Sequence, residues 1–375
     1  MVSLAACAVA LPTSAQGLRD ALGKDGTLVG AAINQWQCDG QDTAATAIVR
    51  RHFNCAVAEN VMKCESLQPV EDSFGFRLAD IFMDYCAKNG LTPIGHCLVW
   101  HSQAPKWFFR EQRNGEPLTR EVLVERIRKH ISTVVGRYKG RIHGWDVVNE
   151  AIEGDGSFRR SPLYNIIGED FIEIAFRAAN EADPDAELYY NDYGMDSPAK
   201  REAVCRLVKK LKAKGSRIDG VGMQSHLGLQ YPDLAEYERS LEAFAKCGVK
   251  VMISELDMNV LPNPKEHQGA AVEQNFEYRK RYDPYSNGLP DSIAKRIEDR
   301  WMQLFDIYRR HRTDISRINF WGVSDGQSWL NDWPVHGRTN YPLLFDRQYK
   351  EKPAVQKIME LYTQGTDGTR FACRQ

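Results

Sequence analysis

Two glutamates in this chain stand where a carboxyl group could do acid–base or nucleophilic chemistry. Glu150 closes the apolar segment WDVVNE and Glu255 lies within ISELDM, so both follow residues typical of a buried strand. A pair of carboxyl groups can divide into a proton donor and a nucleophile when their surroundings move the two pKa values apart. Either glutamate alone is more typical of a loop or a helix cap. The elements that position them therefore decide whether they act as a pair.

Metal binding is the rival chemistry, because imidazole is a common metal ligand. The candidates are His96, His101 and His226, but neither an HxH nor an HExxH spacing occurs in the sequence. No Gly-x-Gly-x-x-Gly follows a predicted strand, so a dinucleotide site has no support either. We therefore expect no metal and no cofactor.

Short apolar or β-branched runs alternate with helical patterns along the chain. Eight such runs cover residues 27–34, 55–60, 93–100, 144–151, 187–193, 220–226, 251–258 and 318–325. Apolar residues at helical spacing mark residues 120–138, 170–182, 199–215 and 291–311. Repeated strand–helix alternation indicates a parallel sheet with right-handed crossovers. Eight units favour the α/β class and a single closed (β/α)₈ TIM barrel.

Polar residues gather at the ends of seven of these eight runs. These ends are Glu59-Asn60, Trp100-His101, Asn149-Glu150, Asn191-Asp192-Tyr193, Gln224 with His226, Glu255 with Asp257, and Ser324-Asp325. A single polar end is ordinary for a strand that enters a loop. In a barrel, however, all the carboxyl ends of the strands meet at one mouth, where active sites are built. The glutamates of the fourth and seventh runs would then face each other across that mouth.

Aromatic residues lie close to the same strand ends. Trp100, Trp321 and Trp329 cluster near the third and eighth ends, with Trp333 just after. Aromatic faces beside a few fixed polar groups suit sugar rings, although any one of these tryptophans could equally serve packing. Residues 261–290, rich in Pro, Asn and Tyr, are best interpreted as a long loop on this face, with an insertion without function as the alternative.

Composition excludes several classes of protein. The 375 residues include 49 basic and 50 acidic side chains, a net charge of -1, and 43% hydrophobic residues. A disordered chain would be poorer in apolar residues, and a nucleic-acid-binding protein would show a basic excess. After residue 16 no apolar run reaches the roughly 18 residues of a membrane span. We expect no nucleic-acid partner, no membrane span and a monomer.

The first sixteen residues, MVSLAACAVALPTSAQ, resemble a secretory leader that lacks its basic start. We therefore divide the chain into a leader, 1–16, and one catalytic barrel, 17–375, in a secreted, periplasmic or cell-surface protein. The segment before Cys7 also resembles a lipoprotein signal weakly, which leaves a lipid anchor there open. Nine cysteines without a CxxC spacing do not fix a disulfide pairing.

The motifs resemble those of glycoside hydrolase family ten, and they occur in the order seen in that family. They are ENVMK (59–63), GHCLVWHSQ (95–103), WDVVNEAI (145–152), YYNDY (189–193), GVGMQSH (220–226), ISELDM (253–258), FWGVSDGQSWL (320–330) and PLLFD (342–346). Members of this family are retaining endo-β-1,4-xylanases built on a (β/α)₈ barrel. The resemblance extends from about residue 28 to residue 355, and a match to the whole set of motifs is highly specific.

The resemblance implies a role for each matching residue. Glu150 would be the general acid/base and Glu255 the nucleophile, with His226 and Asp257 keeping the nucleophile ionised and oriented. Asn149 would bind the 2-hydroxyl of the sugar that is cleaved. Other residues would contact xylan or xylo-oligosaccharide: Glu59, Asn60 and Lys63 the next xylose on the non-reducing side; His96, Trp100, Gln103, Gln224, Trp321 and Trp329 the cleavage subsite and its neighbour; Asn191 and Tyr193 the surroundings of the nucleophile and the leaving-group side.

One motif departs from the family pattern. The family usually has ENEMKW, whereas this chain has Val61 and Cys64 in place of the second acidic residue and the tryptophan. Lys63 is retained, so we expect the grip on the distal xylose to persist with different packing behind it.

Two alternatives to an endo-xylanase stay open. A related retaining β-glycosidase that acts on short oligosaccharides or on mixed glucan and xylan would use the same two glutamates. Lys63 and the GHCLVWHSQ segment favour xylan. An inactive carbohydrate-binding barrel would be expected to lack Glu150, Glu255 or His226, and all three are present.

Overall fold

The structure is a computed structural model that describes residues 17–111, 115–116, 118–266 and 274–363. The predicted leader, with Cys7, lies outside the described residues, so export and lipid anchoring stay predictions. The seven cysteines within the described residues are free thiols. Within the same residues, no helix combines the length and the apolar character needed to cross a membrane.

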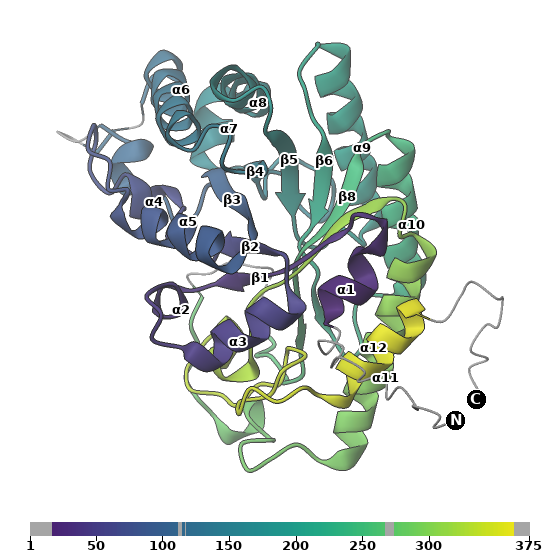
Figure 1. Ribbon diagram of the computed structural model, residues 1–375. Coiled ribbons are helices and arrows are strands. Elements are labelled where there is room, and N and C mark those ends of the chain that lie inside the picture. Colours follow the sequence, from purple (N-terminus) through teal and green to yellow (C-terminus); the bar gives the residue numbers. More distant parts are fainter. Residues whose placement is uncertain (1–16, 112–114, 117, 267–273, 364–375) are drawn as a thin grey trace, which may run out of the picture.

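A closed barrel of eight parallel strands forms the centre of the protein (Figure 1). The strands are β1 (Leu28–Ile33), β2 (Cys55–Ala58), β3 (Thr92–Val99), β4 (Gly144–Asn149), β5 (Glu187–Asp192), β6 (Gly220–Met223), β8 (Lys250–Asn259) and β9 (Ile315–Phe320). Hydrogen-bonded neighbours follow the order β6-β5-β4-β3-β2-β1-β9-β8, and pairing of β6 with β8 closes the ring. A short strand, β7 (His226–Gly228), adds to the edge of β8. The predicted (β/α)₈ TIM barrel is confirmed.

Helices surround the barrel on the outside (Figure 1). The α-helices are α1 (Leu18–Leu22), α2 (Gln35–Cys38), α3 (Thr43–His52), α4 (Cys64–Leu67), α5 (Arg77–Asn89), α6 (Arg120–Arg137), α7 (Pro162–Ile167), α8 (Asp170–Ala182), α9 (Pro198–Ala213), α10 (Leu234–Lys246), α11 (Asp291–Arg310) and α12 (Pro353–Thr363). Short 3₁₀ turns are η1 (Gly23–Asp25), η2 (Lys106–Phe108), η3 (Lys280–Tyr282), η4 (Asp325–Gln327) and η5 (Trp329–Asn331). The four predicted helical segments correspond to α6, α8, α9 and α11.

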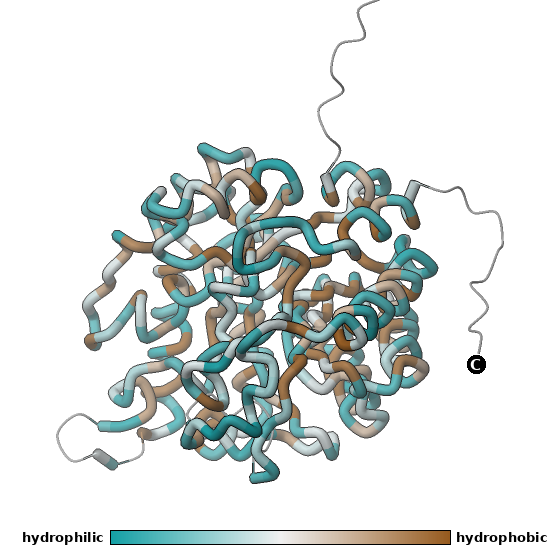
Figure 2. The backbone as a smooth tube through the Cα atoms, turned by 90° about the horizontal axis from the view of Figure 1, so that it is seen from below, coloured by the Kyte–Doolittle hydropathy of each residue, from teal (hydrophilic) through white to brown (hydrophobic). Residues whose placement is uncertain are grey.

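The core lies between the barrel and its helices, as the apolar stripes of these helices require. Seen from below, apolar chain segments gather inside the molecule and polar ones dominate its outer turns (Figure 2). A smaller buried cluster joins side chains that β1, β2, β3, β5 and β8 contribute, together with Trp321. This cluster holds β8, which carries Glu255, while β4, which leads to Glu150, packs through Trp145, Val147 and Val148 in the larger core.

Two predicted strands differ from those observed. Residues 220–226 form two strands, because Ser225 adopts a left-handed φ of 64° between β6 and β7. The strand predicted at 318–325 begins earlier, at Ile315, and ends at Phe320. Its start includes Arg317, which is buried against Asp146 at 3.7 Å. A charged residue is atypical of a strand interior, which is why the pattern placed the start too late.

Candidate active site

The carboxyl ends of the strands surround a cavity of about 510 Å³. Its volume lies within the range of small-molecule sites, roughly 300–1,000 Å³. All predicted site residues line it except Asp257, Asn191 and Tyr193, which lie behind or beside its wall. The residues that line it are Glu59, Asn60, Lys63, His96, Trp100, Gln103, Asn149, Glu150, Gln224, His226, Glu255, Gln274, Asn275, Trp321, Trp329, Asp332 and Trp333.

The Glu150 carboxyl group is buried and receives three side-chain hydrogen bonds, the longest of them, 3.4 Å, from Asn149 Nδ2. Trp100 Nε1 donates to Oε2 at 2.9 Å, and Gln224 Nε2 donates to Oε1 at 3.0 Å. Burial disfavours the charged form, and the negative charge of Asp192 adds to the effect, so the pKa of Glu150 rises to about 7 despite the Gln224 bond. Near neutral pH this group can both give and accept a proton.

The backbone of Glu150 is strained. It has a φ of 58°, a left-handed conformation that costs a non-glycine residue on the order of 1 kcal/mol or more. Two contacts fix the peptide groups around it: Glu150 N donates to Asn191 O at 2.9 Å, and Arg159 Nε donates to Glu150 O at 2.9 Å. The turn directs the chain out of β4 at the point where the carboxyl group enters the cavity.

The Glu255 carboxyl group has the opposite protonation preference. Asn191 Nδ2 donates to Oε1 at 2.7 Å, and His226 Nε2 lies 3.2 Å from Oε2. Burial alone would raise the pKa of Glu255, but the His226 hydrogen bond and the charges of His96 and His226 lower it below its ordinary value. Between these two pKa values, Glu255 is a carboxylate while Glu150 still carries its proton.

A chain of hydrogen bonds supports Glu255 from behind. His226 Nδ1 lies 2.9 Å from Asp257 Oδ1, and Trp329 Nε1 donates to Asp257 Oδ2 at 2.7 Å. Burial would lower the pKa of His226, but Asp257 and Glu255 outweigh it and raise that pKa to about 10. The imidazolium can then donate to both carboxylates at once.

Amide side chains connect the two glutamates. Asn149 Nδ2 lies 3.4 Å from Glu150 Oε1, and its Oδ1 accepts from Asn191 Nδ2 at 2.9 Å. The same Asn191 amide donates to Glu255, and Gln224 Nε2 also lies 3.2 Å from Asn149 Oδ1. Asn191 is fully buried, so it contacts the glutamates rather than the open cavity. The network fixes the two carboxyl groups relative to each other.

A second polar group lies further along the cavity. Lys63 Nζ donates to Asn60 Oδ1 at 2.9 Å and to Gln103 Oε1 at 2.6 Å, and it lies 5.2 Å from the centroid of the Trp100 ring. Burial raises the pKa of Glu59, and Lys63 partly offsets the rise. The predicted substrate-binding residues Asn60, Lys63 and Gln103 therefore lie together, beside the Trp100 ring.

The departure from the family pattern lies behind this group. Val61 and Cys64 are both buried, and Cys64 Sγ lies 4.0 Å from His130 Nδ1. The two positions that depart from the family pattern are therefore packed inside the protein, on either side of Lys63 in the sequence.

His96 and Trp321 line the cavity from β3 and the end of β9. His96 Nδ1 lies 2.9 Å from Asp146 Oδ2, and the His96 and Trp321 rings meet edge to face at 5.2 Å between centroids. Trp333 continues the aromatic wall, stacked on Trp329 at 4.6 Å. These rings give the cavity apolar faces between its hydrogen-bonding groups.

Some residues at the site carried no recognisable signal in the sequence. Gln274 and Asn275 line the cavity, so part of the 261–290 loop lies on this face as interpreted; residues 267–273 lie outside the described residues. Asp332 lines it as well. Arg159 is recognised as part of the site only from the structure. Its NH2 donates to Tyr193 OH at 2.6 Å and its Nε donates to Glu150 O, so Arg159 and Tyr193 both lie beside Glu150. A lone arginine in a loop could not be told from an ordinary surface residue.

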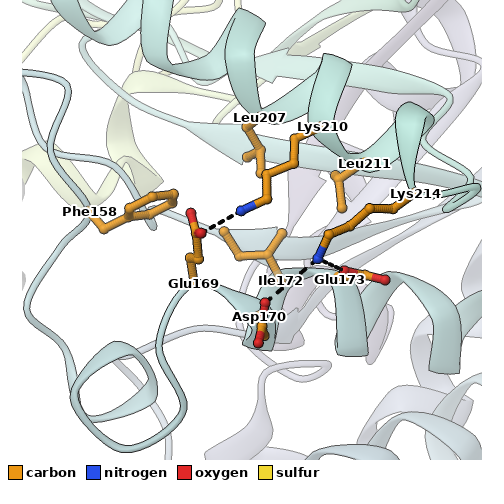
Figure 3. A pocket seen from close by; sticks show the side chains of 9 residues that line it. All are labelled: Phe158, Glu169, Asp170, Ile172, Glu173, Leu207, Lys210, Leu211 and Lys214. Carbon is orange, nitrogen blue, oxygen red and sulfur yellow. Dashed lines mark hydrogen bonds and ion pairs between the residues drawn. The ribbon is translucent and has the colours of Figure 1, made fainter.

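Two other features of the described residues lie away from this cavity. A small surface cavity of about 20 Å³ separates α8 from α9, and ion pairs of Lys210 and Lys214 with acidic residues cross it (Figure 3). It has room for about one water molecule. Glu238 and Glu242 on α10 and His311 just after α11 bring their potential ligand atoms within 4.8 Å of one another. The histidines considered as metal ligands from the sequence do not belong to this group.

Comparisons with known proteins identify relatives that cover nearly the whole chain. The chain is 52% identical over 362 residues to an endo-1,4-beta-xylanase A from Xylanibacter ruminicola, with 96% of each chain covered. It is 39% identical to an endo-1,4-beta-xylanase from Geobacillus stearothermophilus, covering 93% of this chain and 99% of that one. A solved GH10 endoxylanase from a sugarcane soil metagenome superposes with a TM-score of 0.87 at 44% identity, covering 92% of this chain and 100% of the other. The family model described as Glycosyl hydrolase family 10 matches residues 17–361, and the chain belongs to that family.

Proposed function

We propose that this protein is an endo-1,4-β-xylanase that cleaves xylan with retention of anomeric configuration. The observation that carries the proposal is the division of the two buried carboxyl groups: the pKa of Glu150 is raised to about 7, and that of Glu255 is lowered. Such a pair can supply an acid and a nucleophile to the same bond. The curated relatives that share most of this chain's length carry the name endo-1,4-beta-xylanase.

The proposed reaction has two steps. In the first, Glu255 attacks the anomeric carbon while Glu150 protonates the glycosidic oxygen, so the leaving sugar departs with that proton and a glycosyl-enzyme ester forms. In the second, Glu150, now a carboxylate, takes a proton from a water molecule that attacks the anomeric carbon and releases Glu255. Both steps pass through an oxocarbenium-like transition state.

The remaining site residues are proposed to orient Glu255 or to bind the sugar. His226 and Asp257 would keep Glu255 ionised. Asn149, which contacts the Glu150 carboxyl group and the Asn191 amide, would bind the 2-hydroxyl of the sugar being cleaved. The lysine group at Lys63 would hold the next xylose through charge-assisted hydrogen bonds. The remaining contacts with that xylose, the cleavage subsite and the leaving-group side are proposed for Glu59, Asn60, His96, Trp100, Gln103, Asn191, Tyr193, Gln224, Trp321 and Trp329.

Hydrolysis of glucuronoxylan and arabinoxylan should release reducing ends, and proton NMR of the earliest products should show the β-anomer before mutarotation. Carboxymethylcellulose serves as the matched polymer for the alternative glycosidase. Early α-anomer would contradict retention. Faster release from carboxymethylcellulose than from xylan would favour the alternative, and binding to insoluble xylan without reducing-sugar release would favour an inactive barrel.

The pH dependence of kcat/KM on xylan should be bell-shaped. The ascending limb marks ionisation of Glu255, whose pKa lies below the ordinary 4.5, and the descending limb marks loss of the Glu150 proton near pH 7. Because kcat/KM reports groups of the free enzyme, initial rates at low substrate concentration measure both limbs. A descending limb near the ordinary glutamate pKa would contradict the effect of burial on Glu150.

A further inference from the structure

We propose that Arg159 is a positioning residue that holds Glu150, the proposed acid/base, in the geometry needed for proton transfer. The inference rests on the proposed function and goes beyond it, because Arg159 lies outside the cavity lining. Its side chain is 19% exposed, and each of its three guanidinium nitrogens has a partner. Three directional contacts on one side chain are more than an exposed surface ion pair supplies.

A tight hairpin brings Arg159 back to the acid/base. The chain leaves Glu150, turns, and returns with Ile152 and Phe158 paired as an antiparallel bridge. Arg159 N then donates to Ala151 O at 2.9 Å. The backbone of Arg159 is therefore fixed next to the peptide that follows Glu150, and its side chain needs to span only a short gap.

The guanidinium connects the acid/base to its neighbour on the cavity wall. Nε donates to Glu150 O at 2.9 Å, NH2 donates to Tyr193 OH at 2.6 Å, and NH1 lies 3.2 Å from Glu153 Oε1. Because the guanidinium is planar and rigid, fixing the outer two nitrogens fixes the direction of Nε. The ion pair between Arg159 and Glu153 therefore helps to direct the Nε–H of Arg159 toward the Glu150 carbonyl.

The contact matters because of the conformation that it holds. Glu150 has a left-handed backbone φ of 58°. A residue other than glycine keeps this conformation only when its surroundings impose it. Asn191 O holds the N–H of Glu150, and Arg159 holds its carbonyl. Without Arg159 the peptide after Glu150 can rotate toward an ordinary conformation, and the carboxyl group moves with it. A displacement of about 1 Å is enough to cost on the order of 10²-fold in rate.

The proposal is tested with Arg159→Met, which keeps the apolar stem and removes every donor. On xylan, where the leaving sugar needs a proton, kcat/KM should fall about 10²-fold. On dinitrophenyl β-xylobioside, whose leaving group needs no acid, kcat/KM should stay within about threefold of the unmodified enzyme. On the dinitrophenyl substrate, kcat and KM should fall by the same factor. Hydrolysis of the glycosyl-enzyme becomes slow when its base is misplaced, so this intermediate accumulates.

Azide separates positioning from general damage to the fold. It attacks the glycosyl-enzyme without a general base, so it should raise kcat of Arg159→Met on the dinitrophenyl substrate and form β-xylobiosyl azide. Arg159→Lys, which keeps a single donor group, should recover part of the rate on xylan and also serves if Arg159→Met does not fold. Arg160→Met is the matched control, because Arg160 is exposed and lies over the Tyr164 ring, 4.9 Å from its centroid.

Equal losses on both substrates, or a lost rate that azide does not restore, would overturn the positioning role, and so would an unchanged rate on xylan. The unmodified enzyme distinguishes this failure from that of the proposed function: if it does not hydrolyse xylan, the proposed function fails first.

Discussion

Glu255→Ala should lower kcat on xylan by on the order of 10⁵- to 10⁶-fold, the scale seen when a covalent nucleophile is removed. Glu255 is buried, accepts hydrogen bonds from Asn191 and His226, and is ionised by its surroundings. Without it no glycosyl-enzyme can form, and activated substrates are affected as strongly as xylan. Reducing-sugar assays with xylan and dinitrophenolate release from dinitrophenyl β-xylobioside measure the two rates.

Azide identifies which carboxyl group has been lost. In Glu255→Ala, azide can occupy the space of the missing side chain and attack the anomeric carbon of the β-linked substrate, which inverts it and gives α-xylobiosyl azide. Glu202→Ala is the control, since Glu202 lies on α9 with 73% of its side chain exposed. Near-normal turnover by Glu255→Ala, or a β-azide product from it, would show that the nucleophile has been assigned wrongly.

Glu150→Ala should lower kcat/KM on xylan by about 10³-fold, within the 10²- to 10⁴-fold range of general acid–base catalysis. The loss should depend on the leaving group. Dinitrophenolate departs without a proton, so the first step on that substrate should be nearly unaffected, while the second step slows for want of a base. A burst of dinitrophenolate followed by slow turnover, recorded by stopped-flow absorbance, is the expected signature.

Addition of azide should restore turnover of Glu150→Ala and give β-xylobiosyl azide, the opposite anomer to that from Glu255→Ala. Loss of the same size on xylan and on the dinitrophenyl substrate would contradict the assignment of Glu150 as acid/base. The thermal unfolding midpoint should change little, because the substitution removes the cost of burying a carboxyl group together with the hydrogen bonds that Trp100 and Gln224 donate to it.

The barrel and the two glutamates could be predicted because both depend on local patterns. WDVVNE and ISELDM are apolar strands that end in polar residues, and parallel strands of a barrel place such ends at one mouth. The break at Ser225 and the early start of β9 at Ile315 could not be predicted in this way. They depend on a left-handed residue and on a buried arginine, Arg317, whose partner lies on another strand.

The same limit applies to the site. Lys63 and Trp329 could be found because they stand in recognisable segments near strand ends. Gln274 lies in a loop whose path no local pattern determines, and it reaches the cavity through tertiary packing. Arg159 acts through its contacts with Glu150 and Tyr193, and no spacing in the sequence indicates those contacts.

The left-handed turn at Glu150 also bears on the engineering of this enzyme. The position combines a conformation that glycine adopts more easily with a carboxyl group buried away from water. Both features oppose folding, and both serve the reaction proposed here. A library ranked by heat resistance alone would therefore tolerate replacement of this glutamate, so selection for thermostability should be combined with a screen for turnover.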